Sequence, residues 1–311
     1  MTTKQSIATI AAILLASTLH AQDACPQYII KSLTANDGLS HNSVRAIMED
    51  RNGYVWMGTS DGLNRYDGMG IRQFSPVDGL PDNNFILSLC EDDNGTIWIG
   101  TASGICTYDP VTGQEKRHII KEESLKINRQ SVYDIVKSPS GDIWIAAKED
   151  GFIRIDPNGG RTEIYRKTRN SLVNLNKALA LCFDNNNNGY FVTGDGDLYV
   201  SSDCLQSAAS IFQNGEKPLA GYRIHNVNYA FGNLIIGVPN MTLIINPVTG
   251  DIRQNNRWPI IHTMITSSAE LWAATERGPV IMDNDLQIKT IPSWYALNEI
   301  PGIEGRACLS I

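Results

Sequence analysis

The sequence EDRNGYVWMGT at residues 49–59 returns as EDDNGTIWIGT at residues 91–101. Aligned over residues 44–68 and 86–110, the two copies are identical at ten of 25 positions. A repeat of fixed period predicts an architecture built from copies of one supersecondary unit. The question of function therefore concerns what a repeated scaffold presents, as well as any single reactive residue.

Four weaker copies follow, and each aligns on the position of the repeated tryptophan. The anchor positions are Trp56, Trp98, Trp144, Tyr190, Leu234 and Trp272. They are spaced by 42, 46, 46, 44 and 38 residues, and a mean of about 43 residues lies in the range of one four-stranded propeller blade. The spacing therefore predicts six complete blades.

Within the first copy, four short runs at residues 44–48, 54–58, 63–66 and 71–74 are rich in Val, Ile, Tyr and Trp. Asn-Gly and Asp-Gly pairs separate them, and these residues tolerate the conformations that tight hairpins need. Short runs between regular turn signals are typical of all-β folds. The sequence thus predicts an all-β chain, a β-propeller of four-stranded blades.

Large rings recur at one register of the repeat, and this predicts that they pack between blades rather than form a platform for sugars. The repeated structural positions are Trp56, Gly58, Trp98, Gly100, Trp144 and Trp272. The Glu-Asp pairs at 49–50 and 91–92 precede turns in equivalent copies. We therefore expect turn and cap hydrogen bonds from them rather than acid–base catalysis.

The two ends of the chain predict a shared seventh blade. Residues 30–39 match residues 71–80 at an offset of 41, so that 30–33 corresponds to an outer strand, and 306–311 resembles the start of an inner strand. We expect a partial seventh blade, with the ring closed or nearly closed by the N-terminal strand. The chain would then be truncated about 20 residues short of a complete ring of seven.

Composition and the N-terminus bear on compartment. The net charge is −7 without a block of like charges, which argues against nucleic acid as a partner.

Lys4 precedes an apolar run at residues 7–19, which is shorter than the ~20 residues that span a bilayer. The sequence predicts a signal peptide at 1–21, cleaved after Ala21, and a propeller domain at 22–311 in the periplasm. An uncleaved anchor and a lipid on Cys25 are the alternatives.

Six cysteines in an exported chain raise the question of disulfides. Cys90 and Cys182 share one register and are expected to be small buried hydrophobes. Cys90 and Cys106 fall on first and third strands of one blade, about 9–10 Å apart, which is too far for a bridge. A pairing of Cys25 stays open. No zinc or nucleotide-binding pattern occurs, so no cofactor and no metal site are expected.

The pattern GLSxN at 38–42, followed by EDxxGxVWxGTxxGLNRYD at 49–67, resembles the two-component regulator propeller repeat. The resemblance implies the N-terminal propeller of the periplasmic sensor region of a hybrid two-component histidine kinase. Such regions usually hold two seven-bladed propellers and an immunoglobulin-like domain ahead of a membrane helix and the kinase.

By the same resemblance, the chain would be a ligand-sensing module for polysaccharide-derived oligosaccharides in a receptor anchored in the inner membrane. Its partners would be the downstream propeller and kinase domains of that receptor, and a homodimer is left open. Kinase activity would reside in those downstream domains, so this chain is expected to be non-catalytic.

Loops on one rim of a propeller are the expected place for a ligand, because a rigid ring holds them. The loops before first strands and between second and third strands share a rim. We predict Asn42, Asp61, Asn84 and Arg129 as ligand-binding residues there. Their side chains would bind sugar hydroxyls or, through Arg129, a carboxylate or sulfate.

Two other classes of function, an enzyme and a protein-interaction platform, are alternatives to the sensor. Residues 93–98 partly resemble the Asp-box of sialidases, but a propeller glycosidase would need positioned carboxylates or a tyrosine nucleophile, and the arginines are scattered rather than clustered. A lyase that acts on a cyclic peptide is a more remote variant of the enzyme hypothesis. A protein-interaction platform is the third alternative.

Overall fold

The computed structural model describes residues 33–74, 85–112, 114–116, 130–158, 161–166, 175–212, 215–256, 259–265, 271–275 and 278–290. All described residues belong to the unit Leu33–Ile311, and the description below concerns that unit alone.

The described chain forms six antiparallel sheets of four strands each, with strands in sequence order within each sheet. We number these sheets as blades one to six. Blade one holds β1 (Val44–Glu49), β2 (Val55–Thr59), β3 (Gly62–Tyr66) and β4 (Ile71–Phe74). Blade two holds β5 (Ile86–Glu91), β6 (Ile97–Thr101), β7 (Gly104–Asp109) and β8 (Gln114–Lys116). Blade three holds β9 (Val132–Lys137), β10 (Ile143–Ala147), β11 (Gly151–Ile155) and β12 (Thr162–Tyr165).

The remaining blades repeat this order. Blade four holds β13 (Ala178–Phe183), β14 (Gly189–Thr193), β15 (Leu198–Ser201) and β16 (Ala209–Ser210). Blade five holds β17 (Asn226–Ala230), β18 (Asn233–Val238), β19 (Met241–Ile245) and β20 (Ile252–Asn255). Blade six holds β21 (Ile260–Ile265), β22 (Leu271–Thr275), β23 (Gly278–Met282) and β24 (Ile288–Thr290). A single 3-10 turn, η1 (Ala35–Asp37), precedes blade one in the described chain.

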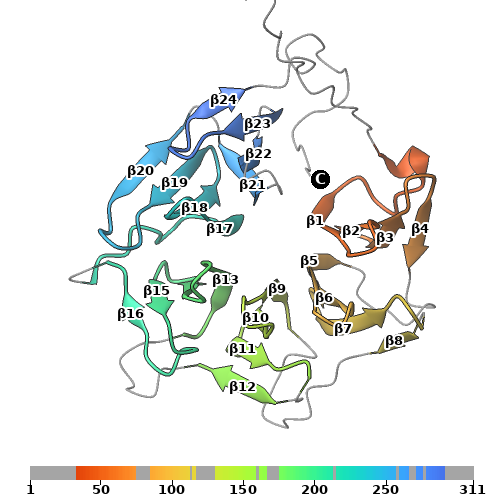
Figure 1. Ribbon diagram of the computed structural model, residues 1–311, viewed down its shortest axis with the longest axis horizontal. Helices are drawn as coiled ribbons and strands as arrows, with labels where there is room; N and C mark the ends of the chain where they lie inside the picture. The colour runs from red at the N-terminus through yellow and green to blue at the C-terminus, as the bar shows by residue number, and fades with distance from the viewer. Residues whose placement is uncertain are drawn as a thin grey trace, which may run out of the picture. The chain divides into compact units, whose positions relative to one another are not determined.

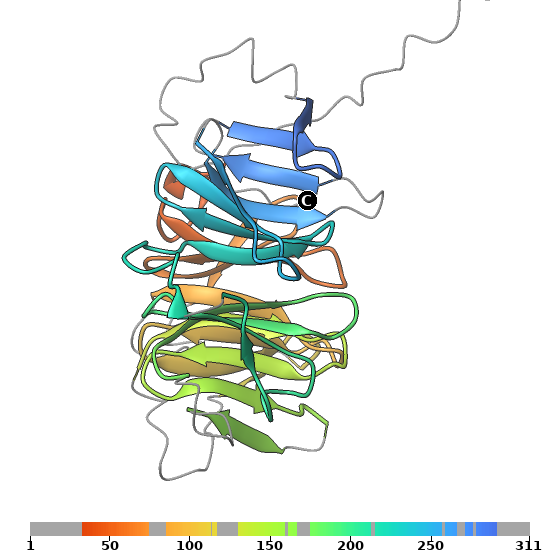
Figure 2. The ribbon, with the colours of Figure 1, turned by 90° about the vertical axis from the view of Figure 1, so that its left-hand side faces the viewer.

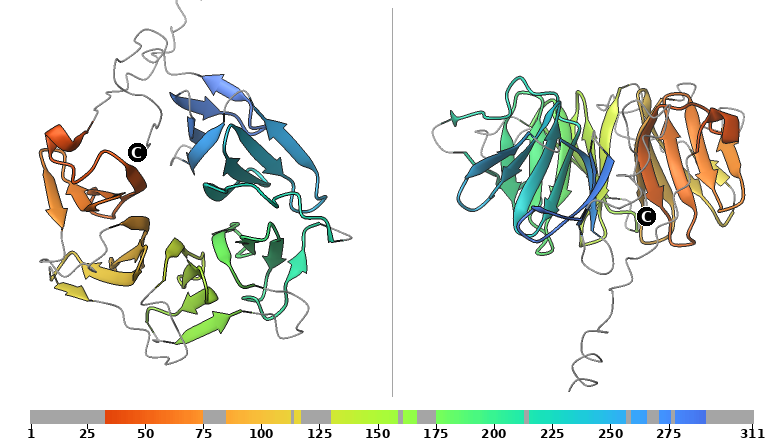
Figure 3. Two further views of the ribbon diagram at one scale, coloured as in Figure 1. Left: turned by 180° about the vertical axis from the view of Figure 1, so that it is seen from behind. Right: turned by 90° about the horizontal axis from the view of Figure 1, so that it is seen from above.

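The blades are arranged as a ring with the first strand of each blade innermost (Figure 1). Consecutive inner strands contact one another in the order β1, β5, β9, β13, β17 and β21. Seen from the side, the sheets stand next to one another face to face (Figures 2 and 3). The molecule is a β-propeller, and the predicted six blades are confirmed. Of the predicted seventh blade, residues 30–32 and 306–311 lie outside the described residues, and Leu33 is not in a strand.

The alignment of the six repeats that the sequence predicts is confirmed by the strands. Each of the six anchor positions is the second residue of the second strand of its blade, in β2, β6, β10, β14, β18 and β22. The strand bounds predicted for blade one differ from the observed bounds by at most one residue. Every inner strand except β17 skips one residue in its pairing with the second strand. Such a bulge bends a strand and increases its local twist.

The core lies between blades. Trp56 has no exposed surface, and its ring lies 5.3 Å from Phe74 of its own blade and 5.3 Å from Tyr108 of blade two. Trp144 is stacked on Tyr165 at 5.6 Å and meets Phe191 of blade four at 5.3 Å. Trp98 and Trp272 are also buried. These rings fill the space between neighbouring sheets, where burial of large aromatic area contributes most to stability.

Glycines follow two of these tryptophans because the next inner strand approaches closely. A Cβ on Gly58 would lie 2.4 Å from Cγ2 of Ile86, and one on Gly100 would lie 2.9 Å from Cγ1 of Val132. Ile86 and Val132 are themselves fully buried. Any larger residue at these two glycines would therefore push neighbouring blades apart.

Four cysteines fall within the described chain, and all are free thiols. They are Cys90, Cys106, Cys182 and Cys204. Burial raises the pKa of the Cys90 thiol to about 12 and also raises that of Cys182, as expected for small apolar core residues. Cys25 lies outside the described residues.

Candidate functional site

The propeller has two rims, which we name by their turns. The B–C rim comprises the segment before each inner strand and the turn between second and third strands. In four blades one backbone hydrogen bond joins these two segments. The donor and acceptor pairs are Ser60 and Ser43, Ala102 and Phe85, Lys148 and Ser131, and Gly194 and Lys177, at 3.0, 3.0, 3.1 and 2.8 Å. The predicted sharing of a rim by these loops is thus observed.

Asn42 lies on this rim in a loop that is held from inside the blade. Buried Asn64 accepts the Ser40 N–H at 2.9 Å and donates to the Ser40 hydroxyl at 2.9 Å. Asn42 Oδ1 accepts the N–H of Ala35 at 2.6 Å, so the oxygen of its amide is engaged within the loop. The exposed Asn42 side chain therefore has its Nδ2 hydrogens as the group to offer a ligand.

Asp61 lies in the adjacent turn of the same blade. Its backbone N–H donates to the buried Thr59 hydroxyl at 3.1 Å, while its side chain is exposed. The structure thus brings Asn42 and Asp61 to one rim. Asn84 and Arg129 lie outside the described residues.

Blade three adds a polar cluster to the B–C rim that the sequence analysis missed. Asp150 is buried, with 2% of its surface exposed. One carboxylate oxygen accepts a hydrogen bond from Gln130 and the other pairs with Arg166. Gln130 also accepts the Glu149 N–H. A buried carboxylate that is paired in this way fixes its neighbours in place. No sequence motif could signal the cluster, because its members are separated by 16 and 20 residues.

Blade four also presents ion pairs on the B–C rim. Lys177 pairs with Asp195 at 2.7 Å, and Lys217 pairs with Asp197 at 2.7 Å. The hydrogen bond from Lys177 lowers the pKa of Asp195. Lys177 also has φ +60°, a left-handed conformation that is uncommon for lysine and more frequent at functional sites. Partly exposed pairs of this kind contribute little to stability.

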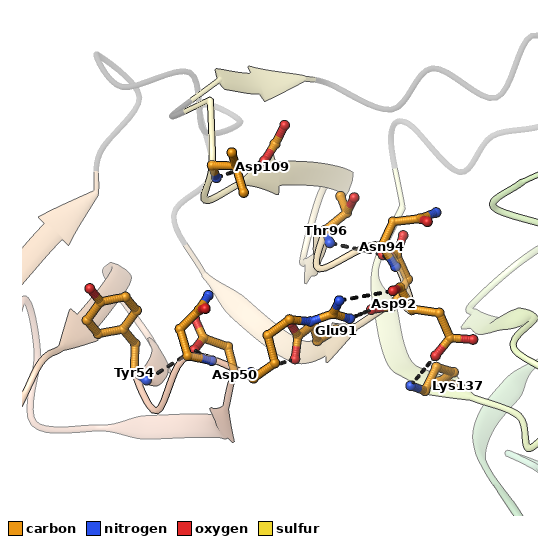
Figure 4. A network of polar contacts seen from close by, with 12 residues as sticks. Asp50, Tyr54, Glu91, Asp92, Asn94, Thr96, Asp109 and Lys137 are labelled. Carbon is orange, nitrogen blue, oxygen red and sulfur yellow. Dashed lines mark hydrogen bonds and ion pairs between the residues drawn. The ribbon is translucent and has the colours of Figure 1, made fainter.

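The A–B rim lies on the opposite side and comprises the first and third turns of each blade. Asp50 Oδ1 accepts the N–H groups of Asn52 and Tyr54, and Oδ2 accepts the Trp56 indole N–H at 2.7 Å. In blade two, Asp92 Oδ1 likewise accepts the N–H groups of Asn94 and Thr96 (Figure 4). Its Oδ2 accepts the Trp98 indole N–H at 2.9 Å. Both carboxylates are buried and fully engaged. They bind the turn, as predicted from the sequence, and also the core tryptophan.

Side chains on the A–B rim also join blade to blade. Arg51 of blade one donates to Glu91 Oε1 at 2.7 Å and to the carbonyl oxygens of Asp92 and Asp93 (Figure 4). Lys137 of blade three pairs with Asp93 at 2.7 Å, and this bond lowers the pKa of Asp93. The residues that resemble an Asp-box are therefore used in turn structure and contacts between blades.

Polar groups on the inner strands link blades two, three and four. An inner strand pairs with another strand on one side only, so N–H groups on its other edge need acceptors. Ser88 Oγ accepts the Ile135 N–H of blade three at 2.8 Å. Asp134 Oδ2 accepts the Leu181 N–H of blade four at 3.2 Å. Both acceptors immediately follow the bulge of their strand.

Burial raises the pKa of the Asp134 carboxyl to about 6, although bonds from Leu181, Ile135 and Ser88 act in the opposite direction. A carboxyl whose pKa is higher in the folded state contributes stability below its unfolded pKa and loses it as pH rises through the folded value. We therefore expect Asp134→Asn to stabilise the fold at pH 8 relative to the wild type by up to ~3 kcal/mol. The gain should shrink towards pH 4.

Urea unfolding at pH 4.5, 6 and 8 tests this, with Asp285→Asn, an exposed position, as the control. If the difference in the free energy of unfolding between wild type and Asp134→Asn is the same at all three pH values, the pKa of Asp134 is not raised by folding, and the prediction is wrong.

No group of three His, Cys, Asp or Glu side chains in the described part of the chain is placed to hold a metal ion. No helix found there has the length and apolar character to cross a bilayer.

Residues 38–61 and 79–103 match the model of the family described as two component regulator propeller. The chain carries two component regulator propeller repeats. The two matches end in the B–C turns of blades one and two, and each includes a buried aspartate and tryptophan of the A–B rim. Residues 131–188 also match the model of the 6-O-methylguanine DNA methyltransferase ribonuclease-like domain. That second match runs across the boundary between blades three and four.

A histidine kinase P4 from Formosa agariphila is 48% identical to this chain over 54 residues, which are 17% of this chain and 4% of that protein. The extracellular domain of BT3049 from B. thetaiotaomicron, which carries the name of a hybrid two component system, has a TM-score of 0.68 at 22% identity over 86% of this chain. The present chain spans 37% of that chain. Virginiamycin B lyase from Staphylococcus aureus gives a TM-score of 0.59 at 17% identity, over 80% of this chain and 84% of its own.

These likenesses confirm the propeller fold and the resemblance to regulator propellers, and they support a sensor role. Because the fold is shared with a lyase, it does not by itself decide between a sensor and an enzyme.

Proposed function

We propose that this chain is an extracytoplasmic ligand-sensing module of a two-component receptor, which binds oligosaccharides on the B–C rim without altering them. The observation that carries the proposal is the pair of regulator propeller repeats in blades one and two, together with a fold like that of receptor extracellular domains. A signal peptide at 1–21 would bring the domain at 22–311 to the periplasm.

The geometry of the rim supports binding. Asn42, Asp61 and the blade-four ion pairs present donors and acceptors on loops that backbone hydrogen bonds fix to a rigid ring. Sugar hydroxyls need this kind of preorganised polar surface. Asn84 and Arg129 belong to the same proposed site.

The carboxylates of the described core also support a non-catalytic role. Asp50 and Asp92 each accept three hydrogen bonds, and Glu91 is bound by Arg51. A glycosidase would need carboxylates free to exchange protons with substrate. In a receptor, the bound state would be passed on to the downstream propeller and kinase domains of the same receptor.

The test uses the single variants Asn42→Ala, Asn84→Ala and Arg129→Ala. Binding of xylo-oligosaccharides and oligogalacturonides to the purified chain is measured by titration calorimetry. Loss of one direct hydrogen bond to the sugar should weaken binding by about tenfold. Asn52→Ala, which removes an exposed amide from the opposite rim, is the matched control and should bind as the wild type does. Equal affinity in all four variants would remove the B–C rim as the site.

A further inference from the structure

Blade three contains an arginine that is bound by two carboxylates of its own sheet. Arg154 on β11 is paired in register with Trp144 on β10 and with Glu163 on β12. Its guanidinium donates to Asp142 Oδ2 at 2.8 Å and to Glu163 Oε2 at 3.2 Å. The Tyr165 hydroxyl donates to the same Glu163 oxygen at 2.7 Å. Two carboxylates thus accept hydrogen bonds from the terminal nitrogens of Arg154, while its Nε is buried without an acceptor, as is that of Arg65.

Blade one has an arginine at the equivalent position, but both carboxylates are replaced. Arg65 on β3 is paired in register with Trp56, and on its other side it faces Arg72 of β4. Arg72 thus stands where Glu163 stands in blade three. Asp142 lies two residues before its tryptophan, and in blade one that place is taken by Tyr54.

The two guanidinium groups rest on aromatic rings. Arg65 Cζ lies 4.4 Å from the ring centre of Tyr54 and 5.7 Å from that of Trp56. Arg72 Cζ lies 4.5 Å from the ring centre of Phe74. The faces of these rings attract the cations, yet they do not satisfy the N–H donors.

Within the described part of the chain, neither guanidinium has an ion-pair or hydrogen-bond partner, and Arg65 Nε is buried without an acceptor. The carboxylate nearest in sequence, Asp67, uses Oδ1 for the N–H groups of Met69 and Gly70. Those bonds are the main reason that the pKa of Asp67 is lowered, and Arg65 adds less.

The two arginines destabilise the folded state unless an anion binds to them. Like charges on directly opposed residues of a sheet are destabilising, and a buried donor without an acceptor loses its hydration for no return. Guanidinium groups present parallel N–H donors that match two oxygens of a carboxylate or a sulfate. An external anion would supply what Asp142 and Glu163 supply in blade three.

We propose that Arg65 and Arg72 form a binding site for a carboxylate or sulfate group, with Tyr54 as its aromatic wall. The site is separate from the residues proposed on the B–C rim, and it does not require the sensing function. A chain that binds sulfate here and binds no oligosaccharide would disprove the proposed function and leave this site standing.

Titration calorimetry on the purified chain tests the site at low ionic strength, with sodium sulfate, D-glucuronate and, as the neutral match, D-glucose. Sulfate and glucuronate should bind, and glucose should not. Arg65→Gln and Arg72→Gln should each weaken anion binding by about tenfold or more. Arg253→Gln removes a positive charge from an exposed position on blade five and should leave binding unchanged.

A gain-of-stability variant guards against a loss that arises from misfolding. Arg72→Glu places a carboxylate opposite Arg65, as in blade three. It should abolish anion binding and raise the thermal midpoint relative to the wild type without anion. Unchanged sulfate affinity in Arg65→Gln, or a lower midpoint with retained anion binding in Arg72→Glu, would overturn the proposal.

Discussion

Trp56→Ala should destabilise the propeller by about 3–5 kcal/mol. The Trp56 side chain has no exposed surface and contacts rings of two blades. Its removal leaves a cavity between sheets and deprives Asp50 Oδ2 of the indole N–H. The midpoint of urea unfolding, followed by far-ultraviolet circular dichroism, measures the effect.

Val111→Ala is the control for Trp56→Ala, because 90% of the surface of Val111 is exposed. It should change stability by less than about 0.5 kcal/mol. A loss below about 1 kcal/mol for Trp56→Ala would contradict the packing of blade one against blade two.

Asp92→Ala should cost about 2–4 kcal/mol, because it leaves two backbone N–H groups and the indole N–H of Trp98 without acceptors. Asp92→Asn should cost less, since its amide oxygen can still accept from the turn. Denaturant unfolding of both variants measures these losses.

The neighbouring carboxylate provides a matched control for position 92. Asp93 is exposed and pairs only with Lys137 in the described chain, so Asp93→Ala should change stability by no more than about 1 kcal/mol. Equal losses at 92 and 93 would show that the buried aspartate does not organise the turn.

The architecture could be predicted because it depends on a short pattern that recurs. Trp98 and Trp144 stand in the same register as Trp56, and even Leu234 in the weakest copy occupies the predicted place in its second strand. Local turn chemistry was also predictable, since Gly53 and Gly95 both take positive φ in the predicted turns.

The polar contacts were harder to predict, because sequence separation hides them. That Asp50 would bind Trp56 six residues later was not foreseen. The cluster of Gln130, Asp150 and Arg166 joins segments that no motif connects. The difference between Arg65 and Arg154 emerges only when strand register shows that they occupy the same position.

The central claim, binding without catalysis, is tested most directly by one calorimetric titration in which the sugar is recovered and analysed by mass spectrometry. The account predicts saturable heats with a xylo-oligosaccharide or oligogalacturonide, and a recovered sugar of unchanged mass. Products of cleavage or elimination in the recovered material would contradict it and would make this propeller an enzyme.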